Sequence, residues 1–83
     1  MTSTITKEAF EAVEKELARA ELKFPPFNSY HEGYAIIKEE VDELWGEVKD
    51  KRRKRDNLYY EATQVAAMAI RFMKLVREKE TTQ

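Results

Sequence analysis

The two prolines of the chain, Pro25 and Pro26, are neighbours, and no helix is expected to continue through them. A proline has no backbone N–H to donate, and it disfavours the helical conformation in the residue before it. The pair is flanked by Phe24 and Phe27, which are expected to hold the turn by packing. The prolines therefore mark an ordered turn that separates a first helical segment from the rest of the chain.

Apolar residues recur at the helical period in three segments, residues 6–23, 30–51 and 58–79. This pattern predicts an all-α fold in which the whole chain forms one domain of three helices. Ser29 followed by Glu32 is a capping box, which places the start of the second helix at Tyr30. Asp56 or Asn57 is expected to cap the third helix.

The third predicted helix is apolar around most of its circumference. At about 100° per residue the apolar arc spans roughly 220°. The arc contains Val65, Ala66, Met68, Ala69, Ile70, Phe72, Met73, Leu75 and Val76. One neighbouring helix cannot cover so wide an arc, so this helix is expected to lie inside a bundle. Because the chain is short and has no cysteine, a second copy is expected to complete the bundle, giving a homodimer or homotetramer.

Charge and hydropathy bear on partners and location. The formal net charge is −1 and the pI is about 5.9, whereas a general nucleic-acid binder carries a basic excess. Residues 1–6 lack the pattern of a secretory signal, and the longest apolar run, residues 65–70, is much shorter than a membrane span. We therefore expect a cytoplasmic protein with neither membrane nor nucleic acid among its partners.

Acidic residues cluster on the second predicted helix. Glu39, Glu40, Glu43 and Glu47 lie within two turns of one another, and residues three or four apart share a face. Glu40 and Glu43 can therefore converge on one point. A hard divalent cation such as Mg²⁺ would relieve the repulsion between such carboxylates. The alternative is a solvated acidic face without a metal.

Glu61 is an acidic residue inside the apolar arc of the third helix. A carboxylate in such a place is rarely buried unless it is paired or coordinated. One explanation is a metal ion shared with Glu40 and Glu43. The other is an ion pair with a basic residue, either Lys38 or Arg71.

Basic residues supply candidates for binding a phosphate group. The connector at residues 49–55 carries six of them, including Lys54 and Arg55, and it could bind a triphosphate or remain a solvated loop. Arg71, placed on the polar side of the third helix, is another candidate. Trp45 could stack on a nucleobase or belong to the core or an interface. With two glycines, the chain has no phosphate-binding loop or glycine-rich dinucleotide turn.

Two groups of residues stand out on consecutive helices: the acidic residues Glu39, Glu40 and Glu43 on one, then Glu61 followed three residues later by Gln64 on the next. This arrangement resembles the paired acidic motif of the MazG-like branch of the all-α nucleoside triphosphate pyrophosphatases. The residues around the motif are similar to those of small phage and bacterial members, so the resemblance covers roughly residues 24–76.

The resemblance implies an oligomeric helical bundle that hydrolyses a nucleoside triphosphate to the monophosphate and pyrophosphate. It implies Mg²⁺ as the cofactor, with Mn²⁺ as a substitute, and a nucleotide as the substrate. The implied metal ligands are Glu40, Glu43, Glu61 and Gln64. The implied catalytic residues are Glu39, Glu40, Glu43 and Glu61, and the candidates for substrate binding are Lys54, Arg55, Arg71 and Trp45.

Gln64 departs from the family pattern, which has an aspartate at this position. Its carbonyl oxygen can still bind a metal, but one negative charge is lost. The departure keeps open an alternative, in which the chain is a non-catalytic helical module that senses a nucleotide or docks on another protein.

Overall fold

The computed structural model describes residues 3–81, with side chains for residues 3–79. It contains three helices: α1 (Thr4–Lys23), α2 (Tyr30–Lys49) and α3 (Arg55–Thr81). No strand occurs within the described residues, so the all-α prediction is confirmed. None of the helices in this part of the chain is both long and apolar enough to cross a membrane.

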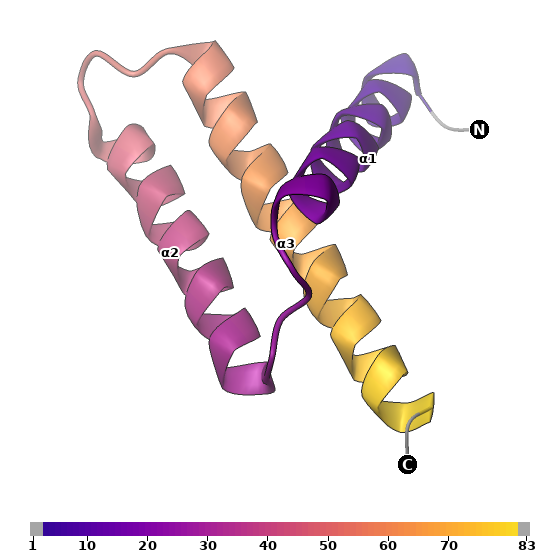
Figure 1. Ribbon diagram of the computed structural model, residues 1–83. Helices are drawn as coiled ribbons and strands as arrows, with labels where there is room; N and C mark the ends of the chain where they lie inside the picture. Colours follow the sequence, from indigo (N-terminus) through magenta and orange to yellow (C-terminus); the bar gives the residue numbers. More distant parts are fainter. Residues whose placement is uncertain (1–2, 82–83) are drawn as a thin grey trace.

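Helix α3 is the centre of the arrangement (Figure 1). Helix α2 runs antiparallel beside its first half, and α1 crosses its middle. Both α1 and α2 pack on α3, whereas the backbones of α1 and α2 do not approach each other within the described residues. The wide apolar arc of the third helix thus faces two neighbours from its own chain.

Local capping residues explain where the first two helices begin. The Ser3 hydroxyl accepts a hydrogen bond from Thr6 N at 3.1 Å, and the Ser29 hydroxyl accepts one from Glu32 N at 3.0 Å. The Glu32 carboxylate accepts from Asn28 N at 2.9 Å, one residue before the partner that a capping box would give it. Helix α1 ends at Lys23, and Phe24, directly before the two prolines, is its C-cap.

The observed boundaries of α3 and α2 differ from the sequence pattern near the basic connector. Helix α3 begins at Arg55, and Lys54 O accepts from Leu58 N at 3.1 Å. Asp56 and Asn57 consequently lie inside its first turn instead of capping it. Helix α2 ends at Lys49, two residues earlier than the pattern indicates.

The buried core is small. Its buried hydrophobic members are Ala20, Phe27, Ala67, Met68 and Leu75. Gly33 allows the start of α2 to approach α3 closely, because a Cβ atom there would lie 2.7 Å from Phe72 Cδ2 and 2.9 Å from Phe27 Cδ2. The Phe27 ring of the proline turn therefore packs where α2 and α3 meet.

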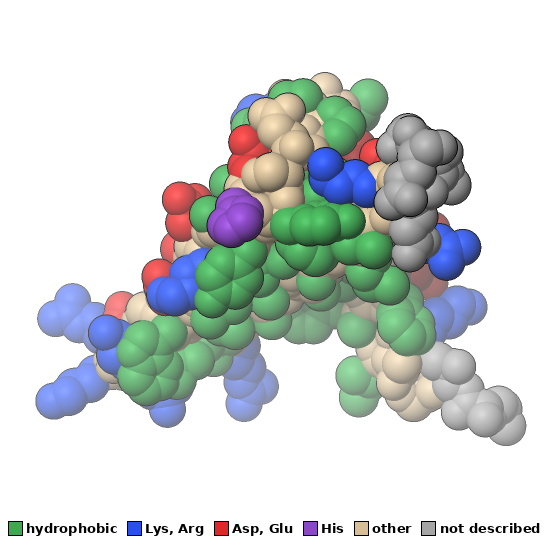
Figure 2. All heavy atoms as spheres, turned by 90° about the horizontal axis from the view of Figure 1, so that it is seen from below, with side chains coloured by type: hydrophobic (Ala, Val, Ile, Leu, Met, Phe, Trp, Pro, Cys, Tyr) green, Lys and Arg blue, Asp and Glu red, His purple; other side chains and the backbone are tan. Residues whose placement is uncertain are grey.

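Much apolar surface remains exposed. Figure 2 shows hydrophobic side chains gathered in a continuous patch over one face of the molecule. Exposed large side chains of α2 lie at helical spacing and form a stripe, the α2 stripe, that consists of Tyr34, Val41, Trp45 and Val48. On α1, Phe10 is 68% exposed although it follows the same helical face as Leu17.

Candidate metal centre

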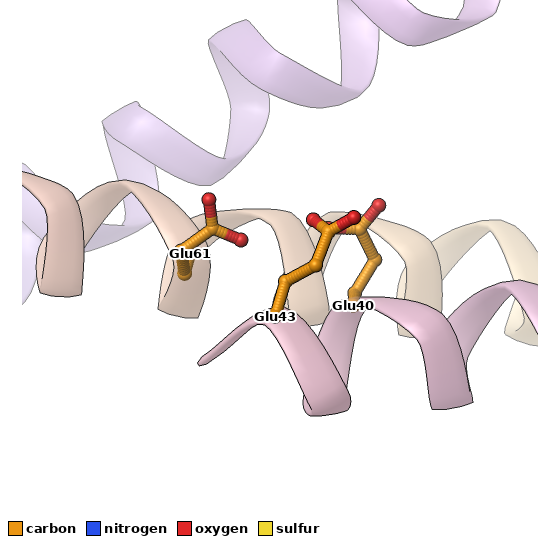
Figure 3. Close-up of side chains that lie close together, drawn as sticks. All are labelled: Glu40, Glu43 and Glu61. Carbon is orange, nitrogen blue, oxygen red and sulfur yellow. The ribbon is translucent and has the colours of Figure 1, made fainter. Parts of the chain in front are cut away.

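Three carboxylates from two helices converge beside α3 (Figure 3). Glu40 and Glu43 are one turn apart on α2, so their side chains rise from the same face. The antiparallel packing of α2 on α3 brings Glu61 to the same place. One oxygen atom of each carboxylate lies within 4.8 Å of those of the other two. We call these three residues the carboxylate cluster.

Two members of the carboxylate cluster, Glu40 and Glu61, resist ionisation. The pKa of Glu40 is raised to about 7, first by burial and then by the neighbouring charges of Glu43 and Glu61. The pKa of Glu61 is also raised, again first by burial and then by Glu43. Negative charge held in a partly buried place without compensation explains both shifts.

Among the described residues, Glu61 has no basic partner that would explain its position. Its Oε2 atom is buried and accepts no hydrogen bond from the described residues. Lys38 pairs with Asp42 at 3.0 Å, and Arg71 donates to the backbone oxygen of Pro25 at 2.7 Å. The ion pair that the sequence left open is therefore not formed. Three carboxylates that can each offer an oxygen ligand, one of them with a buried oxygen atom that lacks a hydrogen-bond partner, fit a hard divalent cation.

A groove of about 420 Å³ lies beside the carboxylate cluster. Glu39, Glu40 and Glu43 form part of the α2 side, and α1 forms the opposite side with Glu16, Arg19 and Ala20. The remaining lining residues come from the proline turn, the first two turns of α2 and α3: Phe24, Pro25, Phe27, Glu32, Ile36, Tyr60, Gln64, Met68 and Arg71. This volume lies in the range of small-ligand sites.

Gln64 lies one turn beyond Glu61 on α3 and lines the groove. It is 6% exposed, and its Nε2 atom has no hydrogen-bond partner among the described residues. The side chain helps to lower the pKa of Glu16, so it lies near that carboxylate, but no hydrogen bond of acceptable geometry joins the two. Gln64 is thus a buried polar group among the residues that line the groove.

Arg71 is buried, and its placement on the polar side of the third helix was wrong. The side chain is packed above the Phe27 ring, with Cζ 4.3 Å from the ring centroid. Nη2 donates to Pro25 O, and Nη1 contacts Met68 Sδ at 3.5 Å. Within the described residues no carboxylate forms an ion pair with this guanidinium. A buried cation at the groove is suited to an anionic ligand.

The other residues proposed for substrate binding lie away from the groove. Trp45 is 56% exposed on α2, with Lys49 Nζ 5.6 Å from the centroid of its ring. Lys54 and Arg55 are exposed at the connector and the start of α3, and neither lines the groove. The sequence interpretation overlooked Glu16, whose signal was its place one turn before the buried Ala20 on α1.

Comparison of the chain with protein-family models, with curated proteins and with solved structures gives no match. The carboxylate cluster and the groove beside it are therefore the features that bear on function.

Proposed function

We propose that the chain is a Mg²⁺-dependent nucleoside triphosphate pyrophosphohydrolase that holds its metal on the carboxylate cluster. Glu61 carries the proposal. Its Oε2 atom is buried without a hydrogen-bond partner among the described residues, and one oxygen of its carboxylate lies within 4.8 Å of oxygens of Glu40 and Glu43 on α2. A carboxylate left in this state costs free energy, and a divalent cation that accepts oxygen ligands removes that cost.

The groove and Arg71 support a phosphorylated substrate. Mg²⁺ is commonly held by a few carboxylates together with substrate phosphates, and the groove lies directly beside the carboxylate cluster. Arg71 offers a buried positive charge in the same groove, without a carboxylate partner in the described structure. The motif resemblance adds the reaction, attack of water at the α-phosphorus with release of pyrophosphate.

The roles of the side chains follow from their places. When bound, a divalent cation supplies polarisation of the phosphate oxygens and a lowered pKa for a coordinated water. Glu39 is exposed, lines the groove next to Glu40, and would accept the proton of the attacking water. Arg71 would orient the phosphates. Ile36 and Met68 would limit the access of other water molecules.

Pyrophosphate release from a panel of nucleoside triphosphates with Mg²⁺ tests the proposed reaction. Mg²⁺ or Mn²⁺ should also raise the melting temperature, because an ion that binds only the folded state stabilises it. Glu61→Ala should abolish both the release of pyrophosphate and the thermal response to metal.

Asp42→Asn is the control, because Asp42 lies on α2 with Glu40 and Glu43, is exposed and pairs with Lys38 outside the carboxylate cluster. An unchanged metal response in Glu61→Ala, or an equal loss in Asp42→Asn, would contradict the shared site.

A second function, a non-catalytic module that binds metal and nucleotide, is favoured by Gln64. A neutral amide stands where the resemblance calls for an acidic metal ligand, which weakens the binding of a hard cation. This module would show the metal response and nucleotide binding, but no release of pyrophosphate from any triphosphate.

A further inference from the structure

Gln64 is a buried polar side chain of the groove whose amide nitrogen lacks a hydrogen-bond acceptor in the described structure. Its residue is 6% exposed, and its Nε2 atom has no hydrogen-bond partner in the described structure. A buried amide donor without an acceptor is unfavourable, so native proteins seldom keep one without a reason. Since Gln64 lines the groove, a molecule seated there can supply the acceptor.

Glu16 provides the complementary group next to it. This buried carboxylate receives three hydrogen bonds from Arg19: from Nε at 2.9 Å to Oε1 and 3.2 Å to Oε2, and from Nη2 at 2.5 Å to Oε2. Its pKa is lowered, chiefly by Arg19, so it remains ionised and can only accept hydrogen bonds. The groove therefore presents an acceptor on α1 beside a donor on α3.

Apolar side chains also line the groove. Ala20, Ile36 and Met68 come from the three helices, and Phe27 comes from the proline turn. Such walls suit a flat ring rather than a sugar or a phosphate. An edge that carries adjacent donor and acceptor atoms is a property of every nucleobase.

We propose that the groove seats the base of the nucleotide, with Gln64 Nε2 donating to an acceptor on the edge of the base and Glu16 accepting from an adjacent N–H of the same edge. Gln64 is then a specificity-determining residue and not a metal ligand. This inference rests on the proposed function for the identity of the ligand. It differs from the sequence interpretation, which placed Gln64 in the metal site.

Calorimetric titration with Mg²⁺ present, using the common nucleoside 5′-monophosphates and base-free ribose 5-phosphate, tests the proposal. At least one monophosphate should bind the wild type ten times more tightly than ribose 5-phosphate, or better. Gln64→Leu, of similar volume, should reduce that preference to less than twofold. Its affinity for Mn²⁺ should stay within twofold of the wild type.

Two results would overturn the assignment. One is a wild type that binds ribose 5-phosphate as tightly as every nucleoside monophosphate. The other is a Gln64→Leu variant that keeps the preference for the base. If this variant also lost affinity for Mn²⁺, Gln64 would be a metal ligand instead. Gln64→Met, which keeps the unbranched shape, provides the same measurement if Gln64→Leu does not fold.

The assay of pyrophosphate release separates this inference from the proposed function. Suppose that no triphosphate releases pyrophosphate but the preference for the base depends on Gln64. This result would support the base site and contradict the proposed hydrolase activity. Suppose instead that the wild type releases pyrophosphate and Gln64→Leu keeps the preference for the base. This result would contradict the base site alone.

Discussion

At the scale of single residues, the raised pKa of Glu40 makes the stability of the metal-free protein depend on pH. The folded-state pKa is about 7, against an ordinary value of 4.5. The folded protein thus holds this proton more tightly than the unfolded chain, and stability falls as pH rises from about 4.5 to about 7. Because Glu40 remains partly solvated, we expect a loss of about 1–2 kcal/mol between these limits.

Urea unfolding in the presence of EDTA at pH 5 and pH 8 measures this loss. Glu40→Gln should flatten the dependence, whereas Glu11→Gln on the exposed face of α1 should leave it as in the wild type. Saturating Mg²⁺ should restore the stability at pH 8, since the ion binds the folded state. An equal slope in Glu40→Gln and the wild type would contradict the electrostatic explanation.

Some site residues could be predicted from the sequence, because their signals are local. Glu61 stands out by its place within an apolar arc, and Glu40 and Glu43 by their spacing of three. Arg71 could not be placed in this way, since its burial depends on the carbonyl of Pro25 and the ring of Phe27, far away in the sequence. The relation between Gln64 and Glu16 likewise exists only after α1 has packed on α3.

At the scale of helices, Gly33 sets how closely α2 approaches α3. A Cβ atom at Gly33 would lie within 3 Å of both Phe72 and Phe27, whereas Gly46 on the same helix has no atom within 4 Å of that position. Gly33→Ala should therefore destabilise the protein by about 1–3 kcal/mol through overpacking. Gly46→Ala should stabilise it by about 0.5–1 kcal/mol through helix propensity.

Thermal or urea unfolding of the two glycine variants gives a matched comparison, since they add the same methyl group to one helix. A Gly33→Ala variant at least as stable as the wild type would show that the tight contact with Phe72 does not limit the packing.

The helices themselves were accessible from the sequence, because periodicity and capping act within a few residues. Ser29 and the proline pair place two boundaries to within a residue. The start of α3 is harder to locate, because a polar run such as residues 49–57 offers several candidate caps. The helix extends through Asp56 and Asn57 to Arg55, so these residues add charge and polarity to its first turn.

At the scale of the whole molecule, a single chain exposes more surface than a compact protein of its mass. The accessible area is 6816 Å² for 9.8 kDa, whereas about 5,200 Å² is typical of a compact monomer. The radius of gyration is 14.2 Å, compared with about 12 Å for a compact domain of this length. A stable dimer buries about 800 Å² on each partner, so the accessible area in excess of a compact monomer is large enough for one.

Light scattering at micromolar concentration should accordingly give the mass of a dimer or tetramer. Trp45→Lys, in the α2 stripe, should lower the mass towards that of one chain, because the lysine would have to lose its hydration in the interface. Leu22→Lys is the control, since Leu22 is exposed on α1, outside the α2 stripe. A wild type that is monomeric and unfolds cooperatively would exclude the assembly.

Within the described residues the backbone of α1 packs on α3 and not on α2, yet α1 forms one side of the groove through Glu16, Arg19 and Ala20. Movement of α1 away from α3 would therefore open the groove. The packing of α2 on α3, which holds the carboxylate cluster together, would remain. Amide hydrogen exchange should show α1 opening at a lower free energy than α2. A nucleotide bound in the groove would slow the exchange of α1. The rate at which α1 moves away from α3 would then limit the rate of product release.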